Sequence, residues 1–346
     1  MKTAMLYRSI NGDLQCDLCA HRCRIKPGMA GICMVRKNQE GILYTLAYGR
    51  TMAMDVDPVE KKPLFHFLPG SAAYSIATVG CNFHCRFCQN WELSQALRED
   101  HFAMGTRAAP EEIVQDALNT ACSSIAYTYT EPTIFFEYAY ETAILAKKQG
   151  LYNIFVTNGY QTPECIDMIA PYLDAANVDL KAFSDEFYRK VLGGRLQPVL
   201  DSLRYMKTRG IWLEITTLVI PGWNDSESEL QAAAQFIVSE LGPDTPWHLS
   251  RFYPAYRMHS IGATPEATVL RTMRIGREAG LRYVYAGNLP SGDFANTYCP
   301  ACHKEIVCRA KFDVIKNDLV NGKCRYCGMR IPGVWSLQSD KRHLSA

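Results

Sequence analysis

Short apolar runs alternate with longer amphipathic stretches over most of the chain. The apolar runs predict buried β-strands at 73–79, 124–129, 153–157, 175–181, 212–220, 247–252 and 282–287. The stretches between them predict helices at 110–120, 134–150, 163–173 and 184–209, a helix that begins in 224–229, and one at 265–279. Six strand–helix units favour an α/β protein with a parallel sheet, either curled as a partial barrel or open and doubly wound.

Polar motifs follow the carboxyl ends of the predicted strands. A cysteine loop follows the first strand, and the next four are followed by TEPT (130–133), TNG (157–159), DLK (179–181) and PGWND (221–225). His248 and Arg251 lie on the sixth strand. Barrel enzymes carry their chemistry on this rim, where successive loops converge. The distribution therefore favours a partial (β/α)6 barrel of the TIM type over a doubly wound sheet.

The composition excludes several kinds of protein. Hydrophobic residues make up 48% of the 346 residues and charged residues 21%, which is ordinary for a globular protein. A net charge of +2 gives no reason to expect nucleic acid or an anionic membrane as the main partner. No apolar run is long enough to predict a signal peptide or a membrane span. We therefore expect a cytoplasmic enzyme.

Most of the fourteen cysteines fall into three clusters with metal-ligand spacing, which favours thiolate-bound metals over disulfides. The central cluster, Cys81, Cys85 and Cys88, has C-x3-C-x2-C spacing on one short loop. Three thiolates this close can bind three corners of a [4Fe–4S] cube and leave one iron open to a small molecule. Zinc is the alternative, with His84 as a fourth ligand.

Each end of the chain carries a further group of four cysteines. The N-terminal group has C-x2-C-x3-C-x9-C spacing and consists of Cys16, Cys19, Cys23 and Cys33. It predicts a structural zinc site or a second iron–sulfur cluster, and His21 could replace one ligand. The C-terminal group forms two C-x2-C knuckles and consists of Cys299, Cys302, Cys324 and Cys327. This spacing is typical of a zinc ribbon or rubredoxin, so it predicts zinc or a single iron.

The clusters divide the chain into three expected parts. Residues 1–70 form an N-terminal four-cysteine module with a lead-in to the barrel, and residues 71–295 form the partial barrel. Residues 296–346 form a C-terminal module like rubredoxin or a zinc ribbon, followed by a tail. A cofactor bound by the central cysteines would lie in the second part.

Motifs along nearly the whole chain resemble those of one enzyme superfamily. They are CDLCAHRCRI with GIC near the start, EKKPLFHFLPGS, GCNFHCRFCQNW, YTYTEPT, VTNGY, VDLKAF, and CPAC with CRYCG near the end. The chain resembles the radical S-adenosylmethionine (radical SAM) enzymes, among them the activating enzymes of glycyl-radical proteins such as pyruvate formate-lyase. It is more closely similar to the AmmeMemoRadiSam group, named for its association with Memo-like and AMMECR-like proteins.

This resemblance implies a fold, cofactors and partners. The fold would be the partial barrel of radical SAM enzymes. A [4Fe–4S] cluster on Cys81, Cys85 and Cys88 would bind S-adenosylmethionine through its open iron. An electron from a ferredoxin or flavodoxin would cleave this cofactor to methionine and a 5′-deoxyadenosyl radical, which would abstract hydrogen from a small organic substrate. Memo-like and AMMECR-like proteins are the implied partners, and no membrane or nucleic acid is expected.

The resemblance also assigns roles to single residues. Phe87 would contact the adenine, and Glu131 would accept the methionine ammonium from a motif in which Thr130 replaces a glycine. Thr157 and Asn158 would meet the ribose or the methionine carboxylate. The structural alternatives are a helix-start carboxylate for Glu131 and simple turn formation for Thr157 and Asn158.

Four further positions complete the expected site. Asp179 and Lys181 match an Asp-x-Lys motif that acts near the substrate, although an ordinary ion pair on the rim would look the same. His248 would contact the cofactor late in the barrel, with Tyr256 as an alternative. Thr217, for which the adjacent Thr216 is an alternative, would face the barrel interior near the adenosine, or both would simply suit a strand through β-branching.

Two other functions compete with this interpretation. The first is a glycyl-radical activase, which acts on a glycine of a partner protein. The compact activases lack the terminal cysteine modules found here, which argues against it. The second is a non-enzymatic metal-binding protein, which the neutral overall charge and the rim motifs disfavour.

Overall fold

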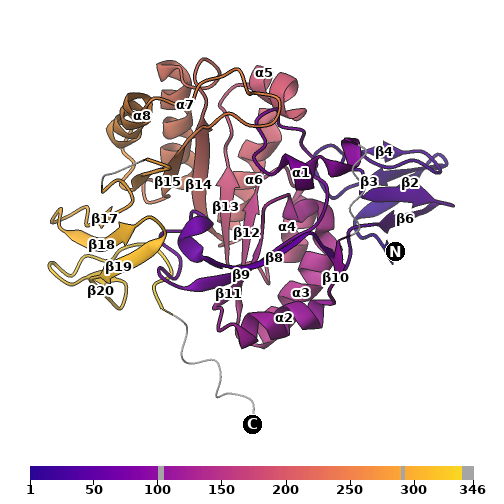
Figure 1. Cartoon of the computed structure of the whole chain (residues 1–346), viewed down its shortest axis with the longest axis horizontal. Helices are drawn as coiled ribbons and strands as arrows, with labels where there is room; N and C mark the ends of the chain where they lie inside the picture. Colours follow the sequence, from indigo (N-terminus) through magenta and orange to yellow (C-terminus); the bar gives the residue numbers. More distant parts are fainter. Residues whose placement is uncertain (100–104, 290–292, 337–346) are drawn as a thin grey trace, which may run out of the picture.

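The computed structural model describes residues 1–99, 105–289 and 293–336. Its centre is an eight-stranded sheet in the order β16-β15-β14-β13-β12-β11-β9-β8 (Figure 1). The parallel strands are β9 (Ala72–Ala77), β11 (Ser124–Tyr127), β12 (Tyr152–Thr157), β13 (Ala175–Asp179), β14 (Trp212–Val219), β15 (Trp247–Arg251) and β16 (Val284–Gly287). An antiparallel strand, β8 (Ala53–Pro58), pairs with β9 and begins the sheet.

The strand order confirms the partial barrel. Each parallel strand lies next to the strand that follows it in the chain, so the order never reverses. A doubly wound sheet would require a reversal at its switch point. Within the described residues, β8 and β16 are the two edges and do not pair with each other, so the barrel is open.

Helices follow the strands as predicted, with one break. Among the larger ones are α2 (Pro110–Asn119), α3 (Phe136–Lys148), α4 (Pro163–Ile169), α6 (Leu196–Thr208), α7 (Glu227–Phe236) and α8 (Glu266–Glu278). The single helix predicted at 184–209 is wrong, because the chain forms α5 (Asp185–Phe187), a π-helical turn η4 (Tyr188–Leu192) and then α6. Gly193 and Gly194 separate η4 from α6, and Gly193 has the positive φ of +77° that ends a helix.

The helix-facing side of the sheet is closely packed. Trp247 of β15 is fully buried, and a Cβ atom on Gly276 of α8 would lie 3.0 Å from its indole ring. Glycine at that position therefore lets α8 approach the sheet closely. Ile125, Phe155 and Ile215 on the neighbouring strands are also fully buried in this core. Burial of side chains this large contributes about 1.5–3 kcal/mol each.

A chain segment fills the interior of the barrel near the amino ends of its strands. Leu64 and Phe67 are fully buried there, in one cluster with Ala73, Ala126 and Ala175 from three parallel strands. Three alanines on the inner face leave room that larger residues would occupy. The sequence EKKPLFHFLPGS, expected only as a lead-in, therefore closes the barrel at the amino ends of its strands.

Small sheets at both ends of the chain flank the barrel on opposite sides (Figure 1). The N-terminal side contains β2 (Tyr7–Ile10), β3 (Asp13–Cys16) and β4 (Arg24–Ile25) in one sheet, and β1 (Lys2–Thr3), β6 (Ile42–Thr45) and β5 (Arg36–Gln39) in another. The C-terminal side contains β17 (Thr297–Tyr298), β18 (Glu305–Ala310) and β19 (Asp313–Asn317). In the part of the chain that is described, no helix is both long and apolar enough to cross a membrane.

Candidate active site

The central cysteines line one cavity at the carboxyl end of the sheet. Cys81, Cys85 and Cys88 open onto a space of about 210 Å³, together with Phe87 and Asn158. Cys81 and Cys85 are buried, and Cys88 is partly buried. The Sγ atom of Cys88 lies 3.1 Å from the hydroxyl of Ser94, at the end of α1 (Trp91–Ser94).

The cysteine loop is held in place by η4. The backbone N–H groups of His84 and Arg86 donate to the carbonyls of Leu192 and Val191, at 3.0 and 3.2 Å. The imidazole of His84 packs over Gly193, where an added Cβ atom would come within 1.9 Å of the ring. Within the described residues, His84 does not line the cavity of the three thiols, so it is not placed as a fourth ligand.

The electrostatics of the three thiols suit a bound cluster. Burial and the neighbouring charge of Glu131 raise the pKa of the Cys81 thiol well above its usual range. Burial also raises the pKa of Cys85 to about 12, against the opposing effect of Lys181. Thiolates at these two buried positions therefore require a positively charged group beside them, and an iron–sulfur cluster would supply one. The backbone N–H of Phe83 donates to Cys81 Sγ at 3.4 Å. Such a hydrogen bond to a ligand sulfur orients it and stabilises its negative charge.

Asp179 and Lys181 line the same cavity. The Lys181 ammonium donates to the Asp179 carboxylate at 2.9 Å, and it lies 6.0 Å above the ring of Phe87. Burial alone would lower the pKa of Lys181, but Asp179 and Cys85 raise it above the ordinary value. Lys181 therefore places a fixed positive charge beside the thiols.

Glu131 is fully buried, and its oxygens are occupied by protein donors. Oε1 accepts hydrogen bonds from the hydroxyl of Thr157 at 2.7 Å and from both the backbone and the side chain of Thr133. Oε2 accepts the backbone N–H of Asn158 at 2.8 Å. Burial raises its pKa, while these donors oppose the effect. In the described structure the carboxylate joins the loops after β11 and β12, and it does not line the cavity.

The neighbouring predicted residues divide into two groups. Thr130 and Asn158 line the cavity, and Asn158 Nδ2 donates to Asn82 at 2.7 Å and lies 3.9 Å from Cys81 Sγ. Thr157 is buried behind the cavity, where its hydroxyl also accepts the N–H of Gly159. Asn158 is therefore the one of the TNG side chains that reaches the cysteine cavity.

Thr217 faces away from the cavity. Its hydroxyl donates to the carbonyl of Leu180 at 2.8 Å and accepts the indole N–H of Trp247 at 3.0 Å, on the helix side of the sheet. Thr216 lines the cavity instead. Side chains alternate between the faces of a strand, so a shift of one residue moves the whole set. The prediction that Thr217 faces the cofactor is therefore wrong, and we assign this place in the candidate site to Thr216.

His248 lines a second, larger cavity of about 660 Å³. Its Nε2 atom lies 2.6 Å from Glu214, and its ring stacks on Tyr285 and meets Phe65 edge-on. Tyr256, the alternative for this role, stacks on Trp91 and bonds to Glu99 instead. Sequence reasoning missed this cavity because its walls come from distant parts of the chain.

The C-terminal module forms one wall of this second cavity. Arg309 on β18 is fully buried and donates to the carbonyl of Phe65 at 2.7 Å. Its Nε atom lies 3.6 Å from Glu60, whose Oε2 atom is buried without a hydrogen-bond partner in the described structure. Lys311 and Phe312, from the turn after β18, complete this wall.

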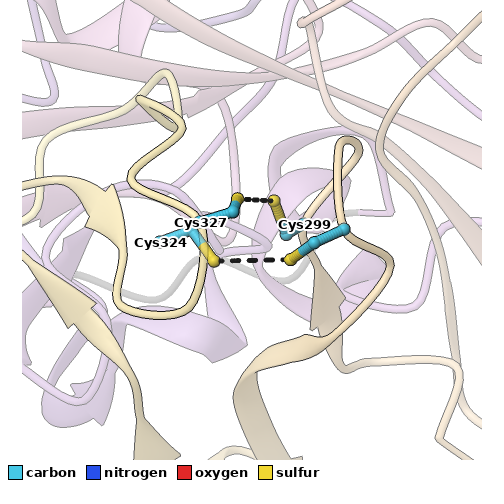
Figure 2. Close-up of side chains that lie close together, drawn as sticks. Cys299, Cys324 and Cys327 are labelled. Carbon is cyan, nitrogen blue, oxygen red and sulfur yellow. Dashed lines mark hydrogen bonds between the residues drawn. The ribbon is translucent and has the colours of Figure 1, made fainter.

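The C-terminal cysteines converge as a metal site requires. Sulfur atoms of Cys299 and Cys327 lie 3.5 Å apart, and those of Cys302 and Cys324 lie 3.7 Å apart (Figure 2). Four thiolates at 2.3 Å from one zinc ion would be separated by roughly 3.8 Å. Burial alone would raise the pKa of Cys324, but hydrogen bonds from the backbone N–H groups of Tyr326 and Cys327 lower it to about 7. This lower pKa favours the thiolate, which is the form that binds a metal.

Comparison with known proteins decides the family of the chain. The profile described as the Radical SAM superfamily matches residues 75–234, which include the three central cysteines. This region of the chain belongs to the radical SAM superfamily. It is also 40% identical over 334 residues to an uncharacterised protein of Methanocaldococcus jannaschii, covering 96% of this chain and 99% of that protein.

Two more distant similarities agree with this membership. The pyruvate formate-lyase 1-activating enzyme of Escherichia coli strain K12 is 21% identical over 168 residues, which cover 45% of this chain and 65% of that enzyme. The crystal structure of a radical SAM methyltransferase from Sphaerobacter thermophilus aligns with a TM-score of 0.50 and 18% identity, over 64% of this chain and 68% of that one. The structural likeness shows the fold alone.

Membership of the radical SAM superfamily implies a [4Fe–4S] cluster and S-adenosylmethionine as cofactors. The three thiols fit such a cluster, because they share one cavity with no fourth thiol or imidazole among its described lining residues. The C-terminal cysteines fit a separate metal ion. Sequence reasoning found both sets from spacing alone.

Proposed function

We propose that this radical SAM enzyme abstracts hydrogen from a small organic substrate held in the second cavity. The observation that carries the proposal is the junction of the two cavities. Thr216 and Ser250, on neighbouring strands β14 and β15, line both of them. A molecule in the larger space would therefore lie next to whatever is bound at the three thiols.

The chemistry supplied by the bound cofactors is one-electron cleavage of S-adenosylmethionine to methionine and a 5′-deoxyadenosyl radical. A primary carbon radical attacks almost any nearby C–H bond, so the position of the substrate decides the product. The protein's contribution is to orient the substrate and to exclude water. The rigid inner face of β14 and β15 suits that task.

The lining of the second cavity indicates the class of substrate. Aromatic rings surround it, contributed by Phe65, His248, Tyr285, Phe294 and Phe312. Within the described residues Lys311 has no ion-pair partner, and it lies on the same cavity wall as Arg309. We infer a compact aromatic or otherwise planar substrate that carries an anionic group.

Asp179 and Lys181 line the cysteine cavity as an ion pair. We propose that Lys181 holds a positive charge near the cofactor carboxylate while Asp179 fixes its position. Phe87 would offer its ring to the adenine, and Asn158 and Thr130 would offer polar atoms to the nucleoside. Glu131 acts in this scheme as a positioning residue, because its oxygens are occupied by the backbone of Asn158 and by threonine hydroxyls.

Glycyl-radical activation is a second candidate, favoured by the similarity to the pyruvate formate-lyase activating enzyme. The aligned region spans about two thirds of that enzyme, and its activity would require a partner protein to insert a glycine loop. Arg309, Lys311 and Phe312 of the C-terminal module form one wall of the second cavity, and a glycine loop would have to enter past this wall. We therefore place this function second.

The proposal extends to partners and compartment. A ferredoxin or flavodoxin would supply the electron, and Memo-like and AMMECR-like proteins remain the proposed partners of an AmmeMemoRadiSam-type enzyme. The cytoplasm is the proposed location, since the clustered thiols suit a reducing compartment.

The test combines product analysis with substitution in the second cavity. Anaerobic enzyme with dithionite and S-adenosylmethionine is expected to form 5′-deoxyadenosine, and a Cys85→Ala variant is expected to form none. With extracts of cells grown on deuterium-labelled precursors, deuterium should be transferred from the substrate to 5′-deoxyadenosine. Lys311→Ala should reduce this transfer, while cleavage of S-adenosylmethionine without deuterium transfer persists. A glycyl radical signal on an added protein, without transfer from small molecules, would favour the activase instead.

A further inference from the structure

We propose that the N-terminal cysteines hold a second [4Fe–4S] cluster, which passes electrons to the site of Cys81, Cys85 and Cys88. The relay part of this proposal rests on the proposed radical SAM chemistry, whereas the metal assignment does not. Four observations carry it: the spacing of the thiols, the cavity between them, a buried arginine beside that cavity, and the contacts that join the two cysteine sites.

The spacing distinguishes the two ends of the chain. At the C-terminal site all four sulfur atoms lie within 4.8 Å of one another. Across residues 1–99, 105–289 and 293–336, no other set of three or more cysteine, histidine or acidic side chains meets this spacing, so the N-terminal thiols are further apart. Four ligands of one zinc ion must be close together, whereas the ligands of a cube are further apart because each binds a different iron.

A cavity lies between the N-terminal thiols. Its lining includes all four sulfur-bearing residues, Cys16, Cys19, Cys23 and Cys33. Ile25 and Ile134 form apolar parts of this lining. This space is small, about 10 Å³, so the separation of the four sulfur atoms around it, rather than its volume, favours a cube over a single ion. Cys19 and Cys23 are partly exposed, so one side of the chamber is close to the protein surface.

A buried arginine provides the charge that such a cluster needs. Arg36 is 1% exposed, lines the cavity and donates to Glu137 at 3.0 Å through one terminal nitrogen. Its Nε atom is buried without a hydrogen-bond partner in the described structure. An unpaired buried donor costs about 1–3 kcal/mol, and a thiolate or sulfide of a bound cluster would accept this hydrogen bond.

The two cysteine sites are in direct contact. His21, between two N-terminal ligands, lies 2.8 Å from the carbonyl of Asn82, next to Cys81. Arg98 donates from a single nitrogen to the carbonyls of Ile32 and Cys81, at 2.6 and 3.1 Å. These hydrogen bonds run from the neighbours of one ligand set to the neighbours of the other.

Backbone packing brings the sites together as well. A Cβ atom on Gly80 would lie 3.0 Å from the carbonyl oxygen of Cys33, so only glycine allows this approach. The positive φ of +98° at Gly80 has the same requirement. Cys33 of one site thus contacts Gly80, the residue before Cys81 of the other, and this proximity supports electron transfer between the two sites.

The proposed relay balances in electrons. A reduced ferredoxin or flavodoxin gives one electron to the N-terminal cluster and is itself oxidised by one electron. The N-terminal cluster then passes that electron to the cluster on the three central thiols and returns to its oxidised state. No proton or further reactant is needed.

Metal analysis of the full chain tests the assignment without using catalysis. A variant with Cys81, Cys85 and Cys88 changed to alanine is expected to keep about four irons and four sulfides per chain. A Cys122→Ala variant, which changes a cysteine outside the three clusters, serves as the control and should keep about eight irons. Zinc in place of iron at the N-terminal site of the triple variant would overturn the assignment.

The relay is tested by a change of reductant. A Cys19→Ser/Cys23→Ser variant should lose about four irons, keep dithionite-driven cleavage of S-adenosylmethionine, and lose cleavage driven by reduced ferredoxin. Equal effects on both reductants, or no effect on either, would overturn the relay. If this variant does not fold, the iron count of the triple variant still decides the metal. If the wild type never cleaves S-adenosylmethionine, the proposed function fails while the iron count still stands.

Discussion

His248 Nε2 lies 2.6 Å from Oε2 of Glu214, and both side chains are buried on the inner face of neighbouring strands. Glu214 also accepts the backbone N–H groups of Phe65 and His66, at 2.9 and 2.8 Å. One carboxylate therefore joins two strands to the segment that fills the barrel. This hydrogen-bond network lies beneath the second cavity and fixes the ring of His248 in its wall.

Glu214→Gln should destabilise the protein by about 2–4 kcal/mol at neutral pH, because an amide cannot accept from every one of these buried donors. The thermal midpoint under anaerobic conditions measures this loss. Glu278→Gln, at the exposed end of α8, is the matched control and should change it little. A Glu214→Gln variant as stable as the control would contradict the role given to the carboxylate.

The same pair predicts a pH dependence. Burial alone would raise the pKa of Glu214, but the hydrogen bond from His248 and the charge of its ring bring that pKa below 4.5. Because the folded-state pKa is lower than the unfolded one, the carboxylate stabilises the fold above pH 4.5, and this contribution is lost as the pH falls further. The stability difference between wild type and Glu214→Gln should therefore shrink on acidification below that value.

Thr216 and Thr217 provide a matched pair across one strand. Thr216→Val removes the hydroxyl that lines both cavities and should lower 5′-deoxyadenosine formation roughly fivefold, since one hydrogen bond contributes about 1 kcal/mol. Thr217→Val breaks the contacts to Leu180 and Trp247 and should lower the thermal midpoint with little change in rate. An equal loss of rate in both variants would show that the site does not discriminate between the faces of β14.

Gly193→Ala should release iron from the central cysteines. The new Cβ atom would lie 1.9 Å from the exposed ring of His84, so this ring must move, and we expect its movement to disturb the adjoining Cys85. Gly210→Ala is the control, because its φ of +76° is nearly the same but nothing lies within 4 Å. Both variants bear about 1–2 kcal/mol of backbone strain. Iron content should fall in Gly193→Ala alone and recover when His84→Ala is added, whereas equal iron in both glycine variants would refute the steric account.

Cys299→Ser should remove about one zinc ion per chain and leave the iron in place. The neighbouring Cys308→Ser is the control, since Cys308 does not belong to the converging group. Loss of zinc should also loosen the wall that carries Arg309, so the second cavity should weaken its hold on substrate while S-adenosylmethionine cleavage without substrate persists. Iron instead of zinc in this site, measured by metal analysis, would contradict the assignment.

Local pattern predicted the barrel and its rim because both depend on periodicity. Apolar runs located the strands, and polar residues just beyond them located the thiols, Asp179 and Lys181. The choice between Thr216 and Thr217 needed the register of β14 to within one residue, which the pair TT in the run WLEITTLVI does not reveal because it places one threonine on each face of the strand.

Tertiary packing decided what the sequence pattern left open. The break at Gly193 follows from its positive φ of +77°, but the packing of His84 over this glycine could not be predicted from residues 184–209. The segment around Leu64 was expected as a lead-in because its prolines suggest a connection, but the alanines that make room for it lie on three other strands. The wall formed by Arg309 likewise joins residues more than 200 positions apart.

The central claim is that Cys81, Cys85 and Cys88 hold a cluster whose open iron binds S-adenosylmethionine. Electron–nuclear double resonance of the reduced protein, with S-adenosylmethionine labelled by ¹⁵N at its amino group, measures that contact directly. We predict a nitrogen coupling to a cluster that is present in the wild type and absent from the Cys81/Cys85/Cys88 triple alanine variant. A reduced cluster on these cysteines that shows no coupling to the labelled cofactor would contradict the account.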